Sequence, residues 1–215
     1  MGFINKNLEL ENLRGSFGSQ HDDLIVVNNF LDEDISCRLA EELDATKGFK
    51  AHRIYSEPGS VQSHCNPVAN FEPINDGYYT TCFHNRLIDF AGFGFLTDAF
   101  SEETRNYLQE ITGYYPRYHP EDNVTATRWD PGTFIIPHTD VGLKLLVIIS
   151  IAFDWQPDFG GQLIFEDERN GKKTVLQPEF NRAVILKPRE DLTHQVLKIQ
   201  DHCQGKRFTV ALAYL

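Results

Sequence analysis

Short apolar segments separated by turn residues dominate the second half of the chain. From residue 123 onward there are eight such segments, each rich in Val, Ile, Thr, Phe or Leu: NVTATRW (123–129), TFIIPH (133–138), LKLLVIISIAF (143–153), GGQLIFE (160–166), KTVLQ (173–177), NRAVILK (181–187), HQVLKI (194–199) and KRFTVALAYL (206–215). Eight short strands at this spacing predict an antiparallel sandwich or barrel. The Asn170–Gly171 pair predicts a two-residue hairpin turn, because both residues tolerate positive φ.

The first half of the chain opens with one strand pattern and one helix pattern. The apolar run 23–31 is typical of a strand. The stretch 32–48 follows, with Asp32 as a capping residue and Gly48 just past the expected end. Its apolar residues recur at helical spacing; they are Ile35, Leu39 and Leu43.

A second helix is predicted over residues 101–113. Ser101 can cap its first turn, and Gly113 can end it. Between the two helices lies segment 49–97, which is rich in aromatic residues, Gly, Asn and Pro and has poor periodicity. A stretch of this length without clear elements is typical of binding loops, and we expect it to form the mouth of a substrate site.

The predicted fold is mainly β, with N-terminal helices supporting a jelly-roll barrel. A length of 215 residues suits one domain. Within 1–215 we expect 1–122 to supply the helical support and the mouth loops, and 123–215 to form the jelly-roll core. A composition of 41% hydrophobic and 24% charged residues is typical of a soluble globular chain.

Charge and cysteine usage narrow the expected partners and compartment. A net charge of −11 and the lack of a Lys or Arg run argue against nucleic acid as a partner. No apolar stretch reaches membrane-spanning length, so no membrane partner is expected. The four cysteines, Cys37, Cys65, Cys82 and Cys203, form no C-x-x-C pair, and the N-terminus does not resemble a secretory signal. We therefore expect a reduced, cytoplasmic protein.

A histidine and an aspartate follow the apolar run that ends at residue 136. On an extended strand, His138 and Asp140 point to one face. His194 opens the seventh strand segment, far enough along the chain for that strand to return beside the first. Two imidazoles and one carboxylate on one face make up the facial triad of non-heme Fe(II) oxygenases, which leaves coordination positions open.

An arginine lies within the apolar terminal segment. Arg207 would be costly to bury without a partner, and Thr209 shares its face of the strand. A fork of N–H donors beside a hydroxyl suits a buried carboxylate. A dicarboxylic keto acid could then be held at both ends, by the metal and by Arg207 with Thr209. A salt bridge to a core Asp or Glu is the structural alternative for Arg207.

These motifs together resemble the Fe(II)/2-oxoglutarate-dependent dioxygenase superfamily. The resemblance rests on HTD (138–140), His194 and RFT (207–209), with FGGQLIFE and FNRAVILKPREDLTHQV between them. It covers residues 123–215, and VVNNFLDEDISCRLAEEL (26–43) is similar to the opening of the prolyl-4-hydroxylase-like branch. The resemblance implies Fe(II), 2-oxoglutarate as co-substrate and O2, and admits ascorbate as an accessory reductant.

The sequence departs from that branch at two positions. Where the branch often has Tyr in Y-x-x-G, this chain has Trp129, with Gly132 retained. Trp129 could contact the co-substrate through its N–H, but it has no hydroxyl. The branch also often uses Lys to bind the distal carboxylate; here Lys206 neighbours Arg207, but its side chain should face the other way.

The resemblance implies hydroxylation of an amino-acid-type substrate, free or within a peptide or protein, with 2-oxoglutarate converted to succinate. Halogenases of the superfamily have Gly or Ala where this chain has Asp140. The residues that could meet a polar substrate are Arg128, Trp129, Arg53, Tyr55 and His84. Two alternatives stay open: a non-enzymatic cupin-like binding module, and a zinc hydrolase with Glu166 as its general base.

Overall fold

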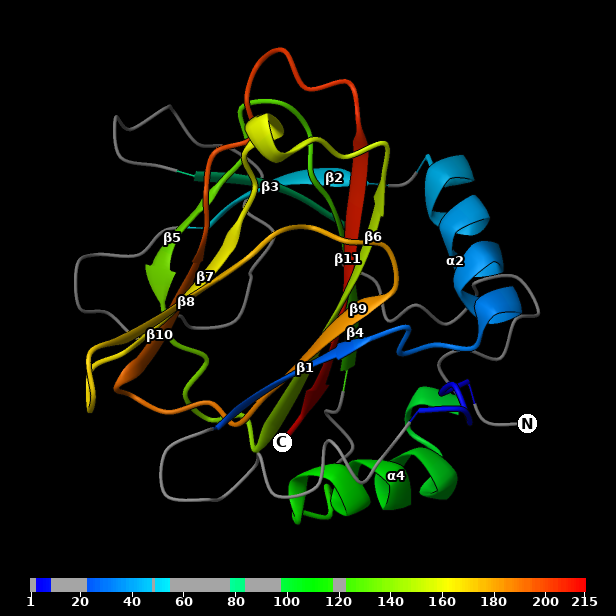
Figure 1. Cartoon of the computed structure of the whole chain (residues 1–215). Coiled ribbons are helices and arrows are strands. Elements are labelled where there is room, and N and C mark those ends of the chain that lie inside the picture. The colour runs from blue at the N-terminus through cyan, green and yellow to red at the C-terminus, as the bar shows by residue number, and fades with distance from the viewer. Residues whose placement is uncertain (1–2, 9–22, 48, 55–77, 84–97, 118–122) are drawn as a thin grey trace.

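Two β-sheets face each other, and the helices pack against the outer face of the larger one (Figure 1). The computed structural model describes residues 3–8, 23–47, 49–54, 78–83, 98–117 and 123–215. The architecture confirms a mainly β fold with N-terminal helices, and all eight segments predicted from residue 123 onward form strands.

The larger sheet has seven antiparallel strands in the order β1-β9-β6-β11-β4-β3-β2. Their bounds are β1 Leu24–Asn28, β9 Arg182–Leu186, β6 Leu145–Phe153, β11 Lys206–Tyr214, β4 Asn123–Arg128, β3 Tyr78–Phe83 and β2 Lys50–Ile54. The two longest strands, β6 and β11, lie side by side at its centre, paired over nine residues. Arg207 and Thr209 lie on β11 of this sheet.

The smaller sheet has four strands in the order β5-β10-β7-β8. Their bounds are β5 Ile135–His138, β10 Leu192–Val196, β7 Leu163–Asp167 and β8 Lys172–Leu176. The short helix η1, Pro157–Phe159, lies between β6 and β7 along the chain. Apart from the β7–β8 hairpin, which lies within the smaller sheet, the chain alternates between the two sheets from β4 onward, so the strands close around a shared interior as a jelly roll does.

Alternation along the central strands separates two cores. On β11, Phe208 and Val210 face the helices, whereas Arg207 and Thr209 face the smaller sheet. The core on the helix side includes Leu39, Leu43, Leu108 and Ile111 together with residues of the larger sheet. The core between the sheets includes Trp129, Leu146, Phe165, Val184, Leu192 and Val196. Polar residues on the inter-sheet face therefore lie inside the barrel.

Both predicted helices form with the predicted caps. Helix α2 spans Glu33–Ala45, and the Asp32 side chain accepts a hydrogen bond from the backbone N–H of Asp34. Helix α4 spans Glu102–Thr112. Ser101 caps its start, and Gly113 ends it in the left-handed conformation at φ 71°. Neither helix is long and apolar enough to cross a membrane, and this holds for every helix in the described ranges.

The predicted two-residue hairpin turn at Asn170–Gly171 is wrong. Asp167 pairs with Lys172, so the connection between β7 and β8 has four residues. Only Gly171 takes a positive φ, 67°, and its N–H donates to the carbonyl of Asp167. The Asp167 carboxylate also accepts from the N–H of Arg169, which stabilises the longer turn.

Segment 49–97 is structured in part. Residues 50–54 and 78–83 form β2 and β3, which extend the larger sheet beyond β4. The sequence pattern of segment 49–97 did not predict these two strands. Residues 55–77 and 84–97 of the segment, and Gly48, lie outside the described residues.

Candidate metal and co-substrate site

Three potential metal ligands come together at the end of β5 and the middle of β10. His138 is the last residue of β5, and it pairs directly with His194 of β10. His194 shares its face with Leu192 and Val196, which belong to the core between the sheets. Asp140 lies two residues after the end of β5, and its carboxylate lies beside both imidazoles.

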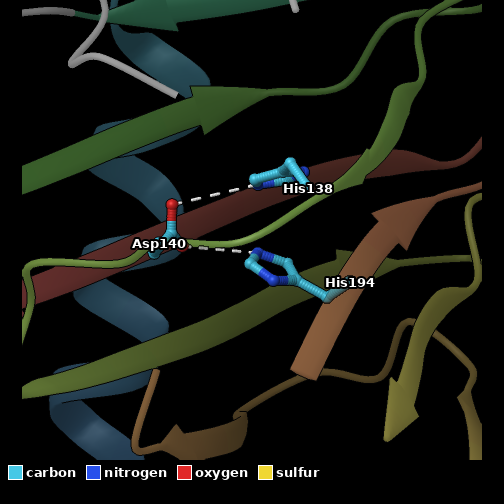
Figure 2. Close-up of side chains that lie close together, drawn as sticks. All are labelled: His138, Asp140 and His194. Carbon is cyan, nitrogen blue, oxygen red and sulfur yellow. Dashed lines mark ion pairs between the residues drawn. The ribbon is translucent and has the colours of Figure 1, made fainter. Parts of the chain in front are cut away.

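The three side chains point toward one another (Figure 2). The Nε2 atom of His194 lies 3.4 Å from Asp140 Oδ2, and that of His138 lies 4.0 Å from Asp140 Oδ1. The two imidazole rings are 4.1 Å apart between centroids. One potential ligand atom from each residue lies within 4.8 Å of the other two. A single ion could therefore contact all three.

Burial favours the ligating form of His194. Desolvation, and next the neighbouring His138, lower its pKa to about 3, with Asp140 acting in the opposite direction. The imidazole is therefore neutral at physiological pH and has a lone pair to give to a metal. Two imidazole nitrogens and one carboxylate suit Fe(II) and leave positions open for other ligands. The donor set fits the metal that the sequence predicts.

Arg207 lies inside the barrel and is 3% exposed. No carboxylate of the described residues forms an ion pair with it, so the salt-bridge alternative has no partner in that part of the chain. Its Nη1 donates to the backbone carbonyl of Gly161, and its buried Nε has no hydrogen-bond partner in the part of the chain that the structure describes. Burial lowers the pKa of its guanidinium to about 9, so the charge is retained at neutral pH. A buried cation of this kind fits an anionic ligand.

Thr209 lies two residues along β11 and is bonded to a tryptophan. Trp129 Nε1–H donates to the Thr209 hydroxyl across 3.0 Å, and both residues are buried. The indole N–H is therefore already used, so Trp129 does not offer it to the co-substrate. Trp129 instead orients Thr209 and packs against Arg207, whose guanidinium carbon lies 4.8 Å from its ring centroid.

Two residues that the sequence reasoning missed complete the surroundings of Arg207. The Trp155 ring lies 5.9 Å from the guanidinium carbon and donates its N–H to the Gly160 carbonyl. Gly161 has φ 71°, and a Cβ there would come within 2.7 Å of Arg207 Nη1 and 2.4 Å of Ile199 Cδ1. Only glycine therefore lets the loop approach Arg207 this closely. A signal was available in the sequence: Trp129 and Trp155 are its only two tryptophans.

Lys206 faces away from Arg207, as predicted. Its Nζ bonds both carboxylate oxygens of Asp44 on α2 at 2.8 Å. The structure also places Arg128 outside the barrel interior, because it pairs with Phe208 across β4 and β11. The Arg128 guanidinium binds the Asp130 carboxylate through Nε and Nη2. It is not brought together with the triad.

Of the remaining residues predicted to meet a substrate, the structure describes the backbone position of one. Arg53 lies on β2 opposite Tyr79 of β3, at the edge of the larger sheet. Tyr55 and His84 lie outside the described residues. Glu166, the base that a zinc hydrolase would need, pairs with Thr193 rather than His194 and so faces the other side of the sheet. Its carboxylate binds Lys173 at 2.6 Å, so it is not available to the triad.

Comparison with known families agrees with this geometry. Residues 124–214 match the family model described as the 2OG-Fe(II) oxygenase superfamily. This match spans the jelly-roll core from β4 to β11, which contains the three potential metal ligands and Arg207. It supports a 2-oxoglutarate-dependent dioxygenase with Fe(II), 2-oxoglutarate and O2 as its cofactors. A search of the curated proteins finds no match.

Solved structures extend the likeness in fold to the N-terminal half. A prolyl hydroxylase from Trichoplax adhaerens, in complex with a hypoxia inducible factor peptide fragment, aligns with a TM-score of 0.63 at 14% identity, covering 95% of this chain and 86% of that one. A Pseudomonas putida prolyl-4-hydroxylase aligns at 0.56 and 14% identity, covering 95% and 88%. A 2OG-Fe(II) oxygenase family oxidoreductase from Burkholderia pseudomallei aligns at 0.60 and 12%, covering 100% and 93%.

Proposed function

We propose that this dioxygenase hydroxylates an unactivated carbon of an amino-acid-type substrate, either a free amino acid or a residue of a peptide or protein. One carbon–hydrogen bond becomes carbon–hydroxyl, while 2-oxoglutarate and O2 become succinate and CO2. The observation that carries the proposal is a buried Arg207, with no carboxylate partner among the described residues, inside the same barrel as the His138, Asp140 and His194 cluster. A keto acid with a second carboxylate is the ligand that both features fit.

Each residue has a separate role in this proposal. His138, Asp140 and His194 hold Fe(II), which supplies the activation of O2 when bound. Arg207 binds the distal carboxylate of 2-oxoglutarate, and Thr209 adds a hydroxyl to it. Phe165 stacks on His194 at 5.5 Å between ring centroids and keeps that side of the imidazole apolar. The barrel interior thus orients the co-substrate and excludes water.

Asp140 favours hydroxylation over halogenation. A halide needs a coordination position beside the two histidines, and the Asp140 carboxylate lies at that position, 3.4 Å and 4.0 Å from the two imidazole nitrogens. The chain keeps the third protein ligand that a halogenase lacks. We therefore propose that the product gains one oxygen atom in chloride buffer and no chlorine.

An amino-acid-type substrate is supported by fold and charge. Two of the aligned structures are prolyl hydroxylases, and one is in complex with a peptide fragment. The net charge of −11 repels phosphate backbones. We propose that segment 49–97 contributes the substrate mouth, since β2 and β3 extend the larger sheet next to β4 and β3 contacts β5, the strand that ends at His138.

The proposal is tested by two measurements on the Fe(II)-loaded protein. Succinate formation from 2-oxoglutarate reports the co-substrate reaction, and a screen of amino acids and peptides by mass spectrometry reports a gain of one oxygen. Succinate formation that disappears in Asp140→Ala supports the reaction. A wild-type protein that forms no succinate, or that oxidises only nucleobases or lipids, would contradict the proposal.

A further inference from the structure

Ser150 is the one polar residue within the apolar strand β6, whose sequence is LLVIISIAF. Its Oγ is buried and has no hydrogen-bond partner among the described residues. A buried hydroxyl without a partner costs free energy, so its presence in this strand calls for a ligand or a bound solvent molecule.

The sheet register places Ser150 beside Thr209. The two residues are directly paired across β6 and β11, and Thr127 of β4 pairs with Thr209 on the other side. Directly paired residues point to the same face, about 5 Å apart between Cβ atoms. Three hydroxyls therefore form a row across the barrel face of the larger sheet. The next pair on the same face of β11 and β6 is Arg207 with Ala152, so the row lies beside the arginine.

The hydrogen bonds already made leave a defined set of donors. Arg207 uses Nη1 on Gly161, and its buried Nε has no partner among the described residues; Arg128 gives an example in this chain of a carboxylate bound side-on by Nε and Nη2. The Thr209 oxygen accepts from Trp129, so its own proton is free to be donated elsewhere. Ser150 offers a third donor of the same kind.

The other arginine next to Ser150 does not compete for this role. Arg182 pairs with Ser150 across β6 and β9. Its three nitrogens are directed to the Asn28 side chain, the Gln177 carbonyl and the Glu179 carboxylate. Each Arg182 nitrogen thus already has a partner, whereas Ser150 and Thr209 lie on the same sheet face as Arg207.

We propose that Ser150 is a further co-substrate-binding residue, which donates a hydrogen bond to the same distal carboxylate as Arg207 Nε and Thr209. This inference rests on the proposed function. A carboxylate can accept about four hydrogen bonds, so three protein donors suit it without crowding. Ala152 and the small hydroxyl residues leave room at the sheet face, whereas a larger apolar residue at position 150 would fill it.

Binding can be measured without turnover by calorimetry on anaerobic, Fe(II)-loaded protein. Three probes separate the two ends of the ligand: 2-oxoglutarate, glutarate, which has both carboxylates but no keto group, and 2-oxobutyrate, which has the keto acid but no distal carboxylate. Tryptophan emission gives a second readout, because the only two tryptophans of the chain both flank Arg207.

Ser150→Ala is compared with Ser36→Ala, which removes a buried hydroxyl from α2 on the other side of the larger sheet. We expect Ser150→Ala to raise the Kd of 2-oxoglutarate and of glutarate about tenfold, the loss of one hydrogen bond to a charged group, and to leave 2-oxobutyrate within about twofold. Ser150→Thr keeps the hydroxyl and should retain most of the affinity, which guards against a folding effect of the alanine variant.

Two results would overturn the role of Ser150 while leaving the proposed function intact. One is Ser150→Ala binding all three probes as Ser36→Ala does, and the other is an equal loss of affinity for 2-oxobutyrate. A wild-type protein that fails to bind 2-oxoglutarate would instead overturn the proposed function itself.

Discussion

Trp129 donates its indole N–H to the hydroxyl of Thr209, 80 residues further along the chain, across 3.0 Å. The bond joins the end of β4 to the inner face of β11 inside the barrel. Because Thr209 accepts this hydrogen bond, its own proton is available to an acceptor other than Trp129, such as a carboxylate bound by Arg207. A tryptophan can therefore influence co-substrate binding although its N–H does not reach the co-substrate.

Trp129→Phe should weaken 2-oxoglutarate binding by a few fold. The substitution keeps an aromatic ring over Arg207 but frees the Thr209 hydroxyl, and one hydrogen bond contributes about 1 kcal/mol. The measurement is the Kd of 2-oxoglutarate in a double-mutant cycle with Thr209→Val. Trp129→Phe should have little further effect once Thr209 is valine; equal effects in both backgrounds would show that the hydrogen bond is not involved.

Replacing His138, Asp140 or His194 with alanine should remove bound iron and turnover together. Each substitution deletes one of three ligands whose atoms lie within 4.8 Å of one another. Metal analysis of the purified variants and succinate formation check the two effects. His202→Ala is the control, because that histidine is exposed and lies beside Asp158. Full iron content in His194→Ala would contradict the assignment of the triad.

Arg207→Ala should raise the KM for 2-oxoglutarate by well over tenfold. Loss of one partner of a buried charge pair costs about 2–5 kcal/mol. The matched control is Lys206→Ala, because Lys206 is the adjacent cation and binds Asp44 on the helix side. We expect its KM to stay near the wild-type value. If Arg207→Ala left the KM unchanged, another residue would have to bind the distal carboxylate.

Asp167 should contribute stability that depends on pH. Hydrogen bonds from Arg169, opposed by burial and supported by Arg189, hold its pKa well below the ordinary 3.8. Since the folded pKa is depressed, the contribution is complete above about pH 4 and declines as the pH falls toward the folded value. Urea unfolding of wild type and Asp167→Asn should differ most at neutral pH and converge in acid. A difference that is constant with pH would contradict this linkage.

Asn181 should be a strong determinant of stability, although it is not one of the three potential metal ligands. Its side chain accepts from the Leu31 N–H at 2.8 Å and donates to the Leu31 carbonyl at 2.9 Å, and its own φ is 57°. Asn181→Ala leaves both Leu31 groups buried without partners, which should cost about 2 kcal/mol or more.

The comparison with Asn181→Gly separates the two contributions of that residue. Glycine loses the same hydrogen bonds but accepts positive φ, so it should be less destabilised than alanine by about 1–2 kcal/mol. The free energies of unfolding from urea titrations give both values. A change below about 0.5 kcal/mol in both variants would show that the hydrogen bonds contribute little.

The local sequence pattern was sufficient to predict most of the strands and both long helices. Short apolar segments separated by turn residues predicted all eight strands from β4 to β11, because most of these strands bury apolar residues. Side-chain capping predicted both helix starts, since Asp32 and Ser101 act on backbone groups only two or three residues away. The turn at Gly171 was mispredicted because the Asp167 carboxylate stabilises a longer connection.

Part of the candidate site could also be predicted from local sequence. Two-residue spacing predicted that His138 lies with Asp140 and that Arg207 lies with Thr209, because alternation along an extended chain is a local property. The pairing of His194 with His138, the hydrogen bond from Trp129 to Thr209, and the row that joins Ser150 to Thr209 all depend on which strands are neighbours. Sheet order is set by packing across the whole chain, so only the tertiary structure could decide them.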